Sequence, residues 1–184
     1  MLLVLAGPSG VGKGAIAERL LARFPNLWPS VSYTTRERRP NEVDGVHYHF
    51  VSGPEFRSLR DADGFLEWFE VFGDLKGTPR LPVEEHLAAG DDVLLEIDVQ
   101  GALEVKQEFP SAFLVFIQPP SREELRRRLA ARGTETPEQL ERRLAEADAE
   151  QAQAGKFDAV VVNHDLEQAV AQVAGILSSS RSDT

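Results

Sequence analysis

The chain contains no cysteine and no long hydrophobic run. The absence of cysteine excludes disulfides, thiolate zinc sites and thiol nucleophiles, so any chemistry must use other side chains. No apolar run approaches the length that spans a membrane, and the first residues, MLLVLAG, are too short and uncharged a stretch to be a secretory signal. We therefore expect a cytoplasmic protein without a membrane partner.

Positive charge is also scarce, because 20 Lys and Arg residues stand against 30 Asp and Glu residues, for a net charge of -10. Binding to nucleic acid without sequence preference needs many phosphate-neutralising cations, so we expect no nucleic-acid partner. The arginines gather around residues 36–39 and 126–132. Such clusters indicate either discrete anion sites or a solvated charged face.

The pattern of apolar runs predicts the fold class. With 184 residues and 42% hydrophobic content, the chain is long enough for one domain with a real core. Short apolar runs typical of buried strands are followed by stretches with helical spacing. This alternation predicts an α/β fold with a mostly parallel sheet flanked by helices. The predicted strands are residues 2–6, 92–98, 112–117 and 158–163.

Between Pro29 and Pro82 the texture changes to polar and aromatic residues with several turn signals. This texture indicates a small, partly antiparallel insertion. We therefore divide the chain into a core of residues 1–28 and 83–184 and an insertion of residues 29–82. Within the core, residues 129–150 are expected to form a short helical lid.

The stretch GPSGVGKGA after the first strand fits a phosphate-binding loop. Gly7, Gly12 and Lys13 satisfy the pattern G-x-x-x-x-G-K, in which backbone N–H groups surround phosphate oxygens and the lysine reaches the outer phosphates. The predicted helix that follows aims its positive end at the same place. The residues expected to bind the nucleotide are Gly7, Pro8, Ser9, Gly10, Val11, Gly12, Lys13, Gly14 and Ala15.

Neither Gly14 nor Ala15 carries the hydroxyl that usually helps such a loop to hold Mg²⁺. Mg²⁺ keeps several of its own waters, so a direct loop ligand is dispensable. Ser9 and Asp98, which ends a predicted parallel strand, are candidates to hold those waters. The alternative is that Asp98 only caps the end of its strand. We expect metal binding without the phosphates to be weak.

A longer stretch, SVSYTTRERRPNEVDGVHYHF (residues 30–50), resembles the GMP-binding segment of guanylate kinases, a family of P-loop nucleoside monophosphate kinases. FLEW, LEIDVQG, PPS followed by RRRLAARGTET, and VVVNHDL occur in the order that this family shows. The resemblance covers nearly the whole chain. It implies transfer of the γ-phosphoryl group of ATP to GMP with Mg²⁺, and a GMP-binding role for residues 29–82.

The resemblance also assigns residues to the phosphate of GMP. Arg36 and Arg39 match the guanidinium clamp of the family, which suits a dianionic phosphate because guanidinium groups donate paired hydrogen bonds. Tyr48 lies beside them in the motif, and Glu42 is expected to orient the arginines. Lys76 stands where the family usually has a tyrosine, and we expect it to keep the phosphate contact as a point charge.

The guanine base is assigned to a second group. Glu67 in FLEW matches the base-reading residue of the family, and an ionised carboxylate accepts both the N1–H and the amino group of guanine. Adenine lacks that pair of donors. Ser32 and Thr78 match hydroxyl positions that complete the base contacts. The alternative for Ser32 and Thr78 is that they are simple turn or strand residues.

On the ATP side, Arg128 and Arg132 are four apart on one predicted helix and share a face. With Arg143 they match family arginines that close over the transferring phosphoryl group, where charge develops in the transition state. Asn163 matches a position near adenine; the alternative is a polar residue at the edge of the core. The predicted catalytic residues are Lys13, Arg36, Asp98, Arg128, Arg132 and Arg143.

Two other functions are weighed against the guanylate kinase. The first is a related P-loop kinase that acts on a sugar phosphate, for which a guanine-reading Glu67 has no use. The second is an inactive guanylate-kinase-like interaction module, for which Lys13, Asp98 and the lid arginines have no use. The oligomeric state is left open.

Overall fold

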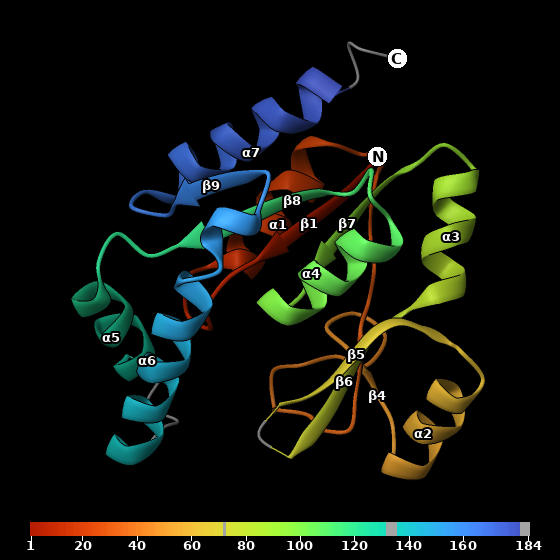
Figure 1. The fold of residues 1–184 in the computed structure, drawn as a ribbon, viewed down its shortest axis with the longest axis horizontal. Coiled ribbons are helices and arrows are strands. Elements are labelled where there is room, and N and C mark those ends of the chain that lie inside the picture. Colours follow the sequence, from red (N-terminus) through yellow and green to blue (C-terminus); the bar gives the residue numbers. More distant parts are fainter. Residues whose placement is uncertain (72, 132–135, 181–184) are drawn as a thin grey trace.

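The computed structural model describes residues 1–71, 73–131 and 136–180, which form two sheets surrounded by helices (Figure 1). The larger sheet has the order β2-β7-β1-β8-β9, and all its paired strands are parallel. This arrangement confirms the predicted α/β fold class. Its strands are β1 (Leu2–Ala6), β2 (Leu27–Pro29), β7 (Asp92–Glu96), β8 (Phe113–Gln118) and β9 (Ala159–Val162).

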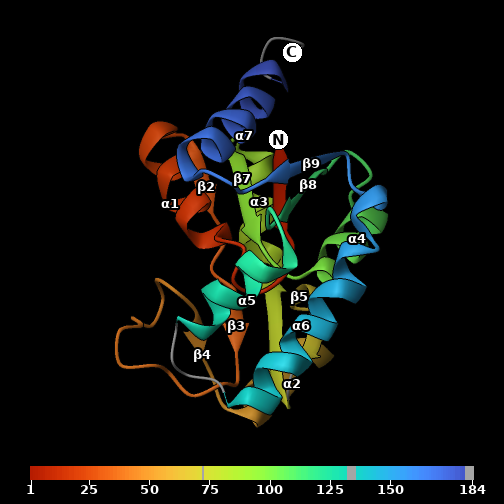
Figure 2. The ribbon, with the colours of Figure 1, turned by 90° about the vertical axis from the view of Figure 1, so that its left-hand side faces the viewer.

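Both faces of this sheet are covered, which explains why its strands read as continuous apolar runs. Along β1, Leu3 and Leu5 pack into one buried cluster and Leu2 and Val4 into another, because side chains alternate across a strand. Figure 2 shows α1 and α7 on one side of the sheet and α4 on the other. The covering helices are α1 (Lys13–Arg23), α7 (Leu166–Ser180), α3 (Arg80–Ala88) and α4 (Val99–Glu108).

The second sheet lies between β2 and α3 in the chain and has the order β4-β3-β6-β5. β3 and β5 pair with β6 in antiparallel fashion, whereas β3 and β4 are parallel. Helix α2 (Gly53–Asp61) closes one face, where the fully buried Phe56 stacks on Phe65 with ring centroids 4.4 Å apart. Its strands are β3 (Tyr33–Thr34), β4 (His49–Phe50), β5 (Phe65–Val71) and β6 (Asp74–Pro79).

The sequence patterns did not predict helices α2 and α3. A start signal for α2 was present, because Ser52 and Glu55 form a reciprocal capping box in the structure. Helix α3 offers no such signal, since its first turn follows Pro79 and no side chain caps it. Helix α2 lies inside residues 29–82, which were interpreted as a partly antiparallel insertion, whereas α3 begins at the end of that segment and lies mostly in the predicted core.

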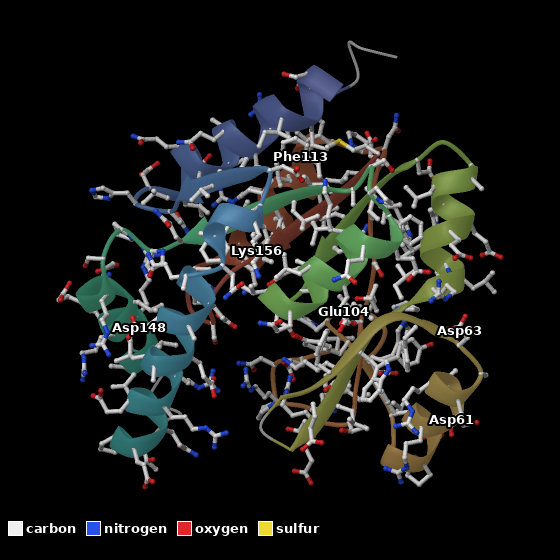
Figure 3. The ribbon with its side chains drawn as sticks, viewed as in Figure 1. Asp61, Asp63, Glu104, Phe113, Asp148 and Lys156 are labelled. Carbon is white, nitrogen blue, oxygen red and sulfur yellow. The ribbon has the colours of Figure 1, made fainter. Side chains whose placement is uncertain are left out.

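A helix pair, α5 (Arg122–Ala130) and α6 (Pro137–Gln151), projects beyond the larger sheet beside the second one (Figure 1). Leu129 and Leu144 anchor the pair in the buried cluster below α1. At the surface of these two helices, Arg122 of α5 and Asp148 of α6 form an ion pair of 3.1 Å (Asp148 is labelled in Figure 3). Helix α6 occupies most of residues 129–150, the predicted lid, whereas α5 lies mostly before them. A single 3-10 turn, η1 (Ala154–Lys156), connects α6 to β9.

No helix in the described part of the chain is long and apolar enough to cross a membrane.

Candidate active site

A cavity of about 1000 Å³ opens between the phosphate loop, the second sheet and α6. It lies at the carboxyl ends of β1 and β7, where ligands bind in open parallel sheets. Most of the predicted site residues line it, although they come from distant parts of the chain. These are Gly7, Ser9, Gly10, Gly12, Lys13, Gly14, Ala15, Ser32, Arg36, Arg39, Glu42, Tyr48, Glu67, Lys76, Asp98 and Arg143.

Other predicted residues lie elsewhere. Arg128 and Asn163 line a smaller cavity of about 420 Å³ on the far side of the loop, together with Gly10, Gly12 and Ala15. Pro8, Val11 and Thr78 line neither cavity. Arg132 lies outside the described residues.

The phosphate loop has a backbone that only glycine adopts easily. Gly7 has φ +140°, and a Cβ on it would lie 2.1 Å from the carbonyl oxygen of Ile117. Gly12 caps α1 in the left-handed region, with φ 94° and no side-chain cap. Lys13 begins the helix, and its Nζ donates to the carbonyl of Gly7 at 2.5 Å. The lysine therefore lies across the loop that carries it.

Two carboxylates face the loop from β7 and the residues after it. Asp98 caps α4, since its Oδ1 accepts from the N–H of Gly101 at 2.9 Å, and it also lines the larger cavity. Asp98 therefore caps a helix and also faces the cavity, so the two interpretations of this residue do not exclude each other. Glu96, which the sequence did not identify, ends β7 beside Gly14, where a Cβ would lie 3.5 Å from its Oε2. The sequence signal that could have identified Glu96 is an acidic residue at the end of an apolar strand.

The predicted phosphate clamp is organised by Glu42. Its carboxylate accepts from Nη2 of Arg36 at 2.7 Å and from the backbone N–H of Arg39 at 2.8 Å. Burial raises the pKa of Glu42, but these two arginines outweigh it and hold the pKa below its usual value. The guanidinium of Arg36 also lies 5.6 Å from the ring centroid of Tyr48. Burial raises the pKa of Tyr48, which keeps its phenol protonated as a donor.

The predicted base-reading residue, Glu67, is 5% exposed and lines the cavity. Thr78 donates a 2.5 Å hydrogen bond to its Oε1. Burial raises the pKa of Glu67 to about 7, against the effect of Thr78, and the charges of Asp98 and Glu104 act in the same direction as burial. Glu104 is labelled in Figure 3, on α4. A buried carboxylate with one bonded oxygen suits a ligand that offers donors.

Arg143 and Arg128 differ in their surroundings. From α6, Arg143 donates to Oγ of Ser9 at 3.0 Å, so this arginine reaches the phosphate loop across the cavity. Arg128 donates to Glu124 of its own helix at 2.8 Å and to the carbonyl of Asn163 at 2.9 Å. Arg128 therefore connects α5 to the residue that follows β9.

Asn163 has a similar supporting place, because its Nδ2 donates to the carbonyl of Val11 at 2.7 Å and the residue is 5% exposed. This bond ties the end of β9 to the phosphate loop. The contact fits the plainer interpretation of Asn163, a polar residue at the edge of the core, although the residue also lines the smaller cavity.

Five further cavity residues were not identified from the sequence: Asp74 at the start of β6, and Gln139, Arg142, Glu146 and Glu150 on α6. Burial raises the pKa of Glu150 to about 7; Lys13 opposes this, whereas Asp98 and Glu146 add to it. The signal was present in α6, where polar residues recur at intervals of three and four. That helix was interpreted as largely solvated, and only its packing shows which face meets the cavity.

Comparisons with known proteins agree with this geometry. The family model for guanylate kinase matches residues 1–180. The chain belongs to the guanylate kinase family. A guanylate kinase from Thermus thermophilus is 53% identical over 180 residues, which cover 98% of this chain and 81% of that protein. One from a Synechococcus strain is 54% identical, with 94% of this chain and 92% of that protein covered.

A solved structure agrees as well. The crystal structure of guanylate kinase from Anaplasma phagocytophilum matches with a TM-score of 0.82 and 36% identity, and covers 98% of this chain and 85% of that chain. Lys76, which stands where the resemblance implies a tyrosine, lies in this site. That residue lines the cavity beside Tyr48, with Nζ 5.7 Å from the ring centroid.

Proposed function

We propose that the chain is an ATP:GMP phosphotransferase, which converts ATP and GMP to ADP and GDP. The observation that carries this proposal is that a single cavity joins the phosphate loop with Lys13 to a buried carboxylate, Glu67. The first arrangement suits a nucleoside triphosphate, and the second suits the donor edge of guanine. Curated relatives at about half identity are named guanylate kinases.

On the acceptor side, residues 29–82 are proposed to bind GMP. Ionised Glu67 accepts from guanine N1–H and the amino group, and Ser32 and Thr78 complete the base contacts. Thr78 acts partly through Glu67, because its hydroxyl already donates to that carboxylate.

The phosphate of GMP is proposed to lie between Arg36, Arg39 and Tyr48. Glu42 holds the guanidinium of Arg36 and the backbone of Arg39 in place, which reduces the entropy lost when Arg36 binds the phosphate. All four residues line the cavity.

On the donor side, the loop from Gly7 to Ala15 is proposed to surround the ATP phosphates, with Lys13 and Arg143 neutralising their charge. An oxygen of the GMP phosphate attacks the γ-phosphorus while the bond from that phosphorus to the bridging oxygen of ATP breaks. The attacking phosphate is already anionic, so no general base is needed. Arg128 and Arg132 complete the proposed set on the lid side.

Mg²⁺ is the proposed cofactor. When bound, it neutralises charge on the phosphate oxygens. Among the described residues, no three carboxylates or imidazoles lie close enough together to hold a metal ion alone. Asp98 and Glu96, next to the loop, fit a hydrated ion that is held mainly by phosphates, with Asp98 contacting it through water.

Because water at the γ-phosphate would waste ATP, the second sheet and the lid are proposed to close over the bound nucleotides. Purine nucleotide metabolism in the cytoplasm is the proposed setting, since it supplies both substrates.

The test is an ADP-release assay with ATP and Mg²⁺, which compares GMP, AMP, UMP and ribose 1,5-bisphosphate as acceptors. We expect turnover with GMP alone, and its loss in Glu67→Ala and Lys13→Ala. Glu70→Ala, an exposed acid on the same strand, and Lys156→Ala serve as matched controls. Turnover with the sugar phosphate would favour the alternative kinase, and GMP binding without turnover would favour the interaction module.

A further inference from the structure

Strand β6 carries Lys76 two residues before Thr78, which bonds to the predicted base-reading residue Glu67. Lys76 and Thr78 are two residues apart, so they share a face of the strand at a spacing of about 7 Å. Thr78 pairs with Glu67 across the sheet. Gly77 faces the other way, where a Cβ would lie 2.9 Å from the ring of Phe65. The ammonium of Lys76 therefore lines the cavity, whereas the fully buried Thr78 acts on the base site through Glu67, which also lines it.

The surroundings of Lys76 are mostly cationic. Burial lowers the pKa of Lys76; nearby Asp98 opposes this, whereas Arg36, Lys13 and Arg39 lower the pKa further. Lys76 and Arg36 approach the ring of Tyr48 at 5.7 Å and 5.6 Å from its centroid. Lys76 therefore lines the same cavity as the acceptor arginines, Arg36 and Arg39, and the lysine of the phosphate loop, Lys13.

Hydrogen bonding distinguishes Lys76 from two of its cationic neighbours, Arg36 and Lys13. Arg36 donates to Glu42, and Lys13 donates to Gly7. Within the described residues, no oxygen accepts a hydrogen bond from Nζ of Lys76. A half-buried ammonium in such a place is stabilised by an anion that the cavity receives. The cavity joins the phosphate loop to the acceptor arginines, so the anions that it is proposed to receive are the phosphates of the two nucleotides.

We propose that Lys76 is a catalytic residue that contacts both the phosphate of GMP and the phosphoryl group during transfer. This inference rests on the proposed function. As the new bond forms between a GMP oxygen and the γ-phosphorus, two anionic groups approach each other, and the bond to the ADP oxygen breaks without any proton moving. Lys76 neutralises the oxygens where they meet. The tyrosine usual in the family donates a hydrogen bond but carries no charge.

The test uses Lys76→Met, which keeps most of the length, and Lys76→Tyr, which restores the family residue. Single-turnover rates with saturating ATP and GMP isolate the transfer step, and calorimetry gives the dissociation constant of GMP. We expect Lys76→Met to lower the single-turnover rate by about 10- to 100-fold. We expect Lys76→Tyr to recover the GMP affinity but not the rate. Lys156→Met is the control and should match the unchanged protein.

A second measurement does not depend on turnover. An analogue in which a chain of phosphates joins adenosine to guanosine spans both sites, so Lys76→Met should weaken its binding by a larger factor than it weakens GMP binding. An unchanged single-turnover rate in Lys76→Met, or a full rate in Lys76→Tyr, would overturn the catalytic role. Failure of the unchanged protein to phosphorylate GMP would instead overturn the proposed function.

Discussion

Thr78 Oγ1 lies 2.5 Å from Oε1 of Glu67, and this hydrogen bond joins two neighbouring strands at the buried end of the cavity. Burial raises the pKa of Glu67 to about 7, while the bond from Thr78 opposes that rise. The proposed guanine acceptor therefore changes its charge near neutral pH. Guanine, which offers two donors, requires the ionised form.

The first prediction follows from this pKa. Below about pH 7 the carboxyl of Glu67 is protonated in the free protein, so GMP binding must release that proton. We expect the affinity for GMP to rise about tenfold from pH 6 to pH 8 through this group. Calorimetry on the unchanged protein and on Glu67→Gln measures the difference, since the phosphate of GMP titrates equally in both. The same pH dependence in both proteins would contradict the assignment.

Gly101 of α4 is predicted to position Glu67. A Cβ at residue 101 would lie 2.8 Å from Oε2 and 3.0 Å from Cδ of Glu67, so alanine must displace the carboxylate. We expect Gly101→Ala to weaken GMP binding by about tenfold or more, with the ATP affinity little changed. Gly175→Ala is the matched control, because a Cβ there would meet nothing within 4 Å. It should leave GMP binding unaltered and stabilise α7 by about 0.5–1 kcal/mol.

Arg143 and Arg128 are predicted to respond differently to removal. Arg143 reaches Ser9 across the cavity, so Arg143→Ala should lower kcat by about 100-fold while changing the free energy of unfolding by about 0.5 kcal/mol or less. Arg128 donates to the carbonyl of Asn163 behind the loop, so Arg128→Ala should also cost about 1–2 kcal/mol of stability. Urea unfolding and steady-state kinetics on both variants test the contrast. Equal stability losses would refute it.

The hydroxyl that the loop lacks can be supplied. At Gly14 a Cβ would make ordinary contacts of 3.5 and 3.6 Å with the carboxylate oxygens of Glu96, so serine fits there. We expect Gly14→Ser to lower the Mg²⁺ concentration for half-maximal activity by a few fold with kcat nearly unchanged, because a hydroxyl next to the lysine can ligate the ion. Ala15→Ser, one residue further along α1, is the comparison variant. An unaltered Mg²⁺ requirement in Gly14→Ser would show that the ion does not approach residue 14.

Part of the fold could be predicted because its signals are local. The buried strands read as apolar runs, and the glycines at 7 and 12 mark a backbone that other residues adopt with strain. Helices α2 and α3 were missed in the sequence analysis. Their residues mix polar and apolar character, because each helix buries only a narrow face; Phe56 and Val83 are their buried residues.

The sequence by itself determined the α/β architecture, the phosphate loop and the family, since each depends on residue type and spacing along the chain. Only the tertiary structure decided which polar residues meet. It places Glu150 and Glu96 in the cavity, and it shows that Arg128 and Asn163 hydrogen-bond to backbone carbonyls at the end of β9 and in the phosphate loop. It also decides the pKa of Glu67, because burial and the charges of Asp98 and Glu104 depend on segments far apart in the chain. Helical or strand spacing shows which residues share a face, whereas packing decides what that face touches.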